Sequence, residues 1–180
     1  MSVRPFVKTV ARQSSTTVDD LEGKGVQYTN VMPARADLDS GQGRSWQNTL
    51  GSKSKASAER RLRELDYTWE WLQGENLKVT TPVLTATRLL ADGRKVFFNQ
   101  LIAAYRGWKD SRNKDSKKIQ FGDGSDISEE SMEVVCEIAE NITYDHFWQK
   151  GEILLVDNFL VMHGRRPFVG TRKVLASLSI

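Results

Sequence analysis

An apolar run near the C-terminus constrains the fold more than any other segment. Residues 153–162 read Ile-Leu-Leu-Val-Asp-Asn-Phe-Leu-Val-Met and lead directly into His163. A short, nearly continuous apolar run bounded by turn residues is typical of a strand that is buried on both faces. A second run follows after a turn, so we predict two buried strands, over residues 152–162 and 173–178.

The composition is that of a single soluble domain. The chain has 180 residues, of which 39% are hydrophobic and 27% charged, and this length is sufficient for one hydrophobic core. Its apolar runs are shorter than the roughly 18 residues that cross a bilayer. A net charge of +3, spread among many acids, does not favour nucleic acid. We therefore expect no membrane partner, no nucleic-acid partner and a cytoplasmic location.

The lone cysteine, Cys136, excludes an internal disulfide and a cysteine-cluster zinc site. We interpret it as a buried helix residue rather than a nucleophile, because no histidine lies near it in the sequence. Residues 1–18 contain Arg4, Lys8 and Arg12 but no acid. We interpret residues 1–20 as a loosely ordered or helical start; a mitochondrial transit peptide is the alternative.

Strand signals dominate the region that follows, residues 21–180, which we treat as one domain. The segments with strand or extended character are 26–31, 69–77, 79–90 and 95–101, with a hairpin turn at Asp92-Gly93. Residues 33–55 and 107–126 are polar and turn-rich, so we predict a long loop around Trp46 and a charged connection. The expected fold class is mainly β with flanking helices (α+β).

Two helices are predicted from apolar spacing and caps. The first covers residues 57–65 and begins at Ser57, which can cap it. The second covers residues 128–142, with Asp126 or Ser128 as its cap and acidic residues in its first turn. Its expected buried stripe consists of Met132, Val135, Ala139 and Ile142.

Residues that can bind a metal ion or an anion are concentrated at the end of the apolar run. His163 is followed by Gly164, which leaves space beside the imidazole, and by Arg165, Arg166 and Arg172. Three neighbouring guanidinium groups repel one another unless an anion or a carboxylate meets them. A hydrogen-bonded structural histidine and a solvated, salt-bridged turn are the alternatives that the residues themselves leave open.

The stretch from Trp148 to Phe168, followed by Arg172-Lys-Val-Leu-Ala-Ser-Leu178, resembles the C-terminal end of the TauD/TfdA-like (taurine dioxygenase) family, in particular its clavaminate synthase-like branch. The resemblance covers about residues 20–180. Its upstream segments are Gly25-Val-Gln-Tyr-Thr29, Gly43-Arg-Ser-Trp46, Phe97-Phe-Asn-Gln100, Ala103-Ala-Tyr-Arg-Gly-Trp108 and Phe121-Gly-Asp-Gly124.

The resemblance implies an Fe(II)- and 2-oxoglutarate-dependent dioxygenase, an oxidoreductase that hydroxylates a small organic substrate in its complete form. It implies a double-stranded β-helix (jelly roll), and a two-histidine, one-carboxylate iron site. On this pattern His163 matches the distal iron ligand. Arg172 matches the arginine that pairs with the far carboxylate of 2-oxoglutarate, with Lys173 as the competing assignment. Asn99 and Arg166 fall where substrate contacts are expected.

The family pattern is incomplete in these residues, and no catalytic residue is assigned. The chain has two histidines, and neither begins the His-x-Asp or His-x-Glu unit that supplies the other iron ligands. His146 as a substitute ligand is disfavoured, because Asp145 to Trp148 resembles the entrance to a strand. We therefore expect a jelly roll truncated at its N-terminal side, inactive alone, with exposed strand edges that favour self-association. The alternative is a non-catalytic remnant, a binding module that keeps the basic carboxylate pocket.

Overall fold

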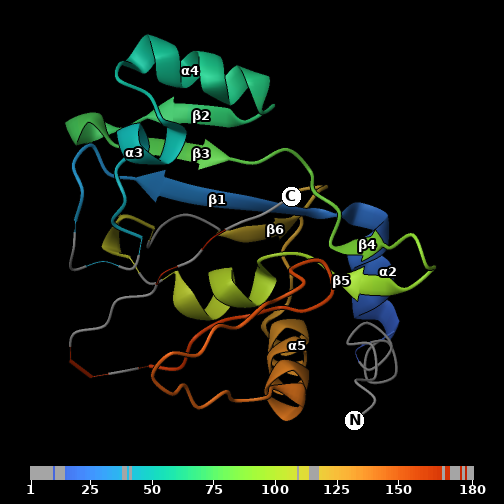
Figure 1. Cartoon of the computed structure of the whole chain (residues 1–180). Helices are drawn as coiled ribbons and strands as arrows, with labels where there is room; N and C mark the ends of the chain where they lie inside the picture. Colours follow the sequence, from blue (N-terminus) through green and yellow to red (C-terminus); the bar gives the residue numbers. More distant parts are fainter. Residues whose placement is uncertain are drawn as a thin grey trace.

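The protein is built around a four-stranded antiparallel sheet with helices packed on either side (Figure 1). In the computed structural model the described residues are 10, 15–37, 40, 42–108, 110–113, 118–167, 169, 170, 175 and 177. The strands are β1 (Val26–Met32), β2 (Thr68–Trp71), β3 (Leu77–Thr80) and β6 (Ile119–Phe121), in the order β2-β3-β1-β6. The described part of the chain is thus mixed α/β with antiparallel sheets.

Strand β1 is central because its side chains are buried along almost its whole length. It pairs with β3 on one side, with Thr29 opposite Thr80, and with β6 on the other, with Val26 opposite Phe121. The Thr29 and Thr80 hydroxyls lie 2.8 Å apart and share a hydrogen bond across the β1–β3 pair. The predicted strand over residues 26–31 is confirmed, whereas β6 was not predicted.

One hydrophobic cluster lies between the sheet and two helices, α3 (Trp46–Leu50) and α4 (Lys55–Glu64). Its buried members are Met32, Trp46, Ala58, Leu62, Leu77 and Val79. Helix α4 begins earlier than predicted, because Ser54 is its N-cap and Ser57 completes a capping box with it. The predicted loop over residues 33–55 therefore contains α3 and the start of α4.

A second hydrophobic cluster joins α2 (Ser15–Lys24), α5 (Glu129–Ile142), the sheet and the π-helical turn η2 (Ala103–Gly107). Ser128 caps α5 by accepting a hydrogen bond from the Ser131 N–H, as predicted. Met132, Val135 and Cys136 are buried, as expected for the inner face of α5. Ile142 is 41% exposed, however, so the last turn of the predicted stripe is wrong.

Strands β4 (Thr87–Leu89) and β5 (Lys95–Phe97) form a hairpin beside α2 (Figure 1). The hairpin confirms the turn predicted at Asp92-Gly93, but β5 ends at Phe97 rather than at residue 101. The Lys95 ammonium lies 2.8 Å from a Glu22 carboxylate oxygen and joins the hairpin to α2. The remaining short elements are the 3-10 turns η1 (Gln73–Glu75) and η3 (Ser111–Asn113).

A close contact between two turns fixes the start of β1 against the end of β6. The Gly122 N–H donates to the Gly25 carbonyl oxygen over 3.1 Å, and Gly25 has φ of +67°. A Cβ at Gly122 would lie 2.2 Å from the Lys24 carbonyl oxygen, so only glycine fits there. The Phe121-Gly-Asp-Gly124 segment therefore has a structural role in this sheet.

Residues 144–167, which we call the C-terminal arm, contradict the strongest sequence prediction. In the described part of the chain, β6 is the last strand, so the strand predicted over residues 152–162 is wrong. Its side chains are not buried either: Ile153 is 95% exposed and Leu155 93%. The second predicted strand, over residues 173–178, lies outside the described residues except for 175 and 177.

The helices described by the structure include none that is both long and apolar enough to cross a membrane.

Candidate functional site

The predicted iron ligand, His163, lies on the C-terminal arm. His163 and its neighbours Met162 and Gly164 are exposed, in backbone that is neither helix nor strand. The predicted 2-oxoglutarate contacts, Arg172 and Lys173, lie outside the described residues. The choice between these two residues therefore stays as the sequence left it.

An aromatic cluster holds the middle of the arm against the β4–β5 hairpin. The rings of Phe98 and Phe159 have centroids 5.6 Å apart. The Arg88 guanidinium lies 4.4 Å from the Phe159 centroid and 5.7 Å from that of Phe98, within the range of a cation–π contact. The arm therefore runs past the end of β5.

This cluster brings Asn99 into the same region as His163. Asn99 follows Phe98, and His163 lies four residues after Phe159, a span of at most about 14 Å of extended chain. The Asn99 side chain donates to the Ala86 carbonyl oxygen over 2.7 Å and accepts from the Leu101 N–H over 3.0 Å. Asn99 thus holds the backbone where β5 ends and the next helical turn begins.

Arg166 is bound by two carboxylates of its own chain. Its Nε donates to Asp145 over 2.8 Å and its Nη1 to Glu140 over 2.9 Å, which fastens the end of the arm to α5 and the residues just beyond it. These hydrogen bonds to Asp145, which has the larger effect, and to Glu140 raise the pKa of Arg166. The Arg166 side chain is 50% exposed, and the predicted substrate contact by Arg166 stays a prediction.

The two histidines are in different surroundings. His146 Nε2 lies 3.1 Å from a Glu152 carboxylate oxygen, and its ring packs edge-on against Trp148 with centroids 4.9 Å apart. The Gln149 N–H and then His146 hydrogen-bond to Glu152 and lower the pKa of that carboxyl. A histidine and a carboxylate are therefore adjacent on the arm, but the family pattern assigns no iron-binding role to either residue.

The described residues do not form the iron site that the family pattern requires. Among them, no three histidine, cysteine, aspartate or glutamate side chains gather closely enough to hold a metal ion. A single imidazole binds Fe(II) weakly, because affinity comes from several preorganised ligands acting together. The described part of this chain thus contains the predicted ligand His163 without a ligand set around it.

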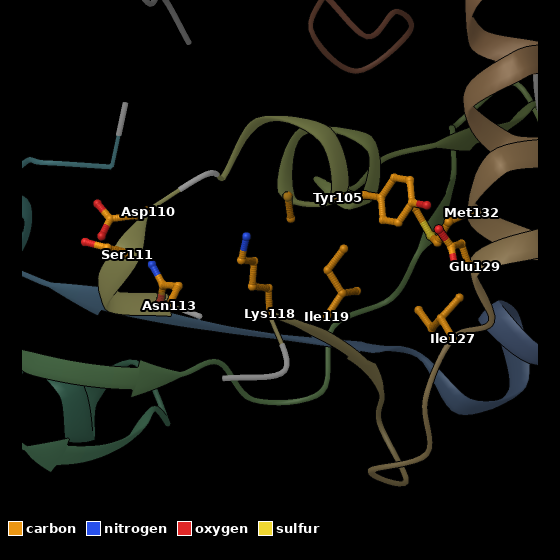
Figure 2. A pocket seen from close by; sticks show the side chains of 10 residues that line it. Tyr105, Asp110, Ser111, Asn113, Lys118, Ile119, Ile127, Glu129 and Met132 are labelled. Atoms are coloured by element: carbon orange, nitrogen blue, oxygen red, sulfur yellow. The ribbon is translucent and has the colours of Figure 1, made fainter. Parts of the chain in front are cut away.

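A hollow of about 720 Å³ lies elsewhere, between η2, η3, β6 and α5 (Figure 2). His163, Asn99 and Arg166, the sequence-predicted site residues that the structure describes, are not among its lining residues. Its polar end carries Asp110 and Asn113, and its other end is apolar, with Ile119, Ile127 and Met132. Its lining residues lie within one stretch of the chain, residues 104–132, most of which the sequence indicated only as a charged connection and the start of a helix.

The polar end of this hollow is internally satisfied. Arg112 and Ser40 both donate hydrogen bonds to the Asp110 carboxylate. Burial raises the pKa of Asp110, but these hydrogen bonds outweigh it and the pKa lies below its usual value. The Asn113 side chain accepts from the Val31 N–H, and Lys118 donates to the Trp108 carbonyl oxygen. These polar groups therefore stabilise the joint between β1, η3 and β6.

Comparison with known proteins defines the class. The profile of the family described as "Taurine catabolism dioxygenase TauD, TfdA family" matches residues 57–178, about two thirds of the chain. This chain belongs to that family, and is therefore a protein of the non-haem Fe(II)/2-oxoglutarate dioxygenase group.

Two curated relatives match at half of their own length. Clavaminate synthase-like protein At3g21360 of Arabidopsis thaliana is 37% identical over 162 residues, which cover 89% of this chain and 49% of the relative. Dapdiamide synthesis protein DdaC of Enterobacter agglomerans is 28% identical over 173 residues, covering 89% of this chain and 50% of that protein. The chain spans about half the length of the curated relatives it matches.

Proposed function

We propose that this chain supplies one part of the active site of an Fe(II)- and 2-oxoglutarate-dependent oxygenase that hydroxylates a small organic substrate. The observation that carries the proposal is the reach of the family match, which extends to residue 178 and so includes His163 and Arg172. These residues are the ones that the family pattern uses for iron and for 2-oxoglutarate.

In this proposal His163 is an iron ligand and Arg172 binds the far carboxylate of 2-oxoglutarate. A planar guanidinium donates two parallel hydrogen bonds to a carboxylate, which an ammonium does not match, so Arg172 is preferred over Lys173. Asn99 and Arg166 orient the substrate. The jelly roll that the family implies is completed by residues that the matched half of the relatives does not contain.

The bound iron and 2-oxoglutarate would provide the oxidising chemistry. The residues described here do not fit the iron by themselves, so no step of that chemistry is assigned to this chain. A His-x-Asp or His-x-Glu unit is absent from the 180 residues, since His146 precedes Phe147 and Trp148 and His163 precedes Gly164 and Arg165. The remaining iron ligands are therefore expected from outside this sequence.

The same observation supports a second candidate, a binding module that retains the arginine pocket without the metal. The two functions differ in what they bind. An oxygenase half-site binds 2-oxoglutarate together with Fe(II), whereas a carboxylate-binding module binds 2-oxoglutarate in the absence of Fe(II).

A chimera tests the proposal directly. Residues 20–180 replace the matched half of the Arabidopsis relative, and the purified protein is titrated anaerobically with Fe(II) and 2-oxoglutarate. The proposal predicts the weak visible charge-transfer band of the iron–2-oxoglutarate chelate, and its loss in His163→Ala. Arg172→Ala should weaken 2-oxoglutarate binding by roughly tenfold or more, and Lys173→Ala much less, because the former removes a bidentate ion pair.

Two other results would speak against the oxygenase proposal or in favour of the binding module. A chimera that unfolds like a single folded protein but gives no band contradicts the oxygenase proposal. A thermal shift of this chain by 2-oxoglutarate without metal, lost in Arg172→Ala, would instead support the binding module.

A further inference from the structure

The large exposed apolar side chains of this protein are concentrated on the C-terminal arm. Those of the arm are Tyr144, Phe147, Trp148, Ile153, Leu154, Leu155, Phe159, Val161 and Met162. So many exposed large apolar side chains in one short segment are uncommon on a protein that functions as a monomer, and they mark a segment that something else covers.

The arm is not simply a polar tail. Its sequence from residue 153 to 162 is almost entirely apolar, with the composition of a buried strand. It is held in place at two points, by Phe159 against Phe98 and Arg88, and by Arg166 against Asp145 and Glu140. The arm therefore presents its apolar residues to solvent while its middle and its end are fastened to the body.

The comparisons indicate what covers it. Both curated relatives contain the matched half and about as much chain again, since the match spans 49% and 50% of their lengths. The family profile runs through the whole arm. A segment of strand composition needs neighbouring strands for its N–H and C=O groups, and among the described residues none is provided.

We propose that the C-terminal arm is a docking surface for a strand-bearing polypeptide of the kind that makes up the unmatched half of the TauD/TfdA relatives. Residues 152–162 become a strand when this partner pairs with them, and Ile153 and Leu155 become buried in the shared core. The choice of partner rests on the proposed function. Docking explains why His163, at the end of this segment, lies among no other metal ligands in the described part of the chain: the ligand set forms only when the two parts meet.

Co-expression provides the test. The full chain, carrying an affinity tag, is co-expressed with a polypeptide that comprises the unmatched half of the Arabidopsis relative, and is purified in metal-free buffer with chelator. The proposal predicts that the two polypeptides co-purify in equal amounts. An Ile153→Asp/Leu155→Asp double variant should weaken binding by roughly tenfold or more, because docking would bury two unpaired carboxylates.

Leu89→Asp is the matched control. Leu89 is the most exposed large apolar side chain among the described residues that precede the arm, at 68%, and it lies on β4. It follows Arg88, and successive strand residues point to opposite faces, so it faces away from the Phe159 contact. This variant should bind like the unmodified chain. Because residues 153 and 155 are more than nine-tenths exposed, their variants should also keep the helical circular dichroism of the unmodified chain.

Two results would overturn the proposal. The first is failure of the two polypeptides to co-purify, or co-purification that the double variant does not weaken. The second is a stable dimer of the chain alone that buries residues 153 and 155, which would make a second copy the occupant. The co-purification is done without iron, so it can succeed even if the proposed function is wrong. If the two polypeptides bind each other but the chimera gives no chelate band, the result contradicts the proposed function and still supports the docking surface.

Discussion

The body of the molecule, residues 17–142, and the C-terminal arm both contain apolar segments. The apolar side chains are buried in the body and exposed in the arm. In the body, Leu62 and Leu77 are fully buried between the sheet and α4. In the arm, Leu155 is 93% exposed although it lies in a more continuous apolar run. An apolar pattern therefore shows which side chains need to be buried. The helices and strands that bury them must come from the rest of the fold.

The largest expected effect is a difference in the free energy of unfolding between a variant of the body and a variant of the arm. Leu62→Ala should lower the free energy of unfolding by about 2–5 kcal/mol, because it removes buried methyl groups and leaves a cavity. Leu155→Ala should change it by less than about 0.5 kcal/mol, since an exposed side chain loses little on truncation. Urea unfolding of both variants checks the contrast. Equal destabilisation would show that the arm is packed in solution.

A second prediction concerns alkaline pH and the body alone. Burial raises the pKa of Tyr28 to about 12, although the Gln100 N–H that donates to its hydroxyl lowers it. The folded pKa is above the unfolded value of 10.0, so the contribution to stability is complete below pH 10 and is lost as pH rises toward 12. The loss attributable to this phenol should be about 2–3 kcal/mol.

Urea unfolding between pH 8 and 12 measures this loss. Tyr28→Phe should flatten the alkaline part of the stability curve, whereas Tyr144→Phe, in the exposed arm, serves as the control and should leave it unchanged. Curves of the same shape for both variants would contradict the burial of Tyr28.

A third prediction concerns a variant that weakens the contact between the arm and the β4–β5 hairpin. Phe159→Ala removes the aromatic and cation–π contacts with Phe98 and Arg88, worth about 1 kcal/mol together. The arm should then be cleaved faster by trypsin at Lys150 and Arg165, while the unfolding of the body is unchanged. Phe147→Ala, at a side chain that is 85% exposed, is the control and should leave the cleavage rate unaltered.

The smallest expected effect is at the other fastening point. The hydrogen bonds from Arg166 hold the pKa of Asp145 below its ordinary value of 3.8. The folded pKa is depressed, so this contact is fully present above pH 3.8 and is lost as pH falls through the lower folded value. Trp148 fluorescence should change in that acidic range, and the change should be absent in Asp145→Asn. A transition that persists in the variant would assign it to another group.

Local signals sufficed for much of the body. Strand β1 follows from the strand signals of residues 26–31, and α5 from Ser128 and its acidic first turn. The N-cap of α4 was misplaced by three residues, because Ser54 and Ser57 can each cap a helix and only the capping box decides between them. Strand β6 was missed, since three residues beside a charged turn carry too little pattern.

The arm could not be predicted from its own residues for a different reason. Residues 152–162 carry the composition of a buried strand, yet a strand exists only where partners accept its hydrogen bonds. For the site, the family pattern selected His163 and Arg172, while the pairing of Arg166 with Asp145 and Glu140 depends on how the arm returns to α5. That return is a tertiary contact over more than twenty residues, which sequence spacing does not encode.

The central claim is that the arm becomes a strand only when a partner pairs with it, and amide hydrogen exchange tests it most directly. Exchange of residues 152–162 is measured in the chain alone and in the complex with the unmatched half of the Arabidopsis relative. The account predicts rapid exchange alone, strong protection in the complex, and unchanged protection of β1 in both. Protection of residues 152–162 in the isolated monomer, or continued rapid exchange in the complex, would contradict it.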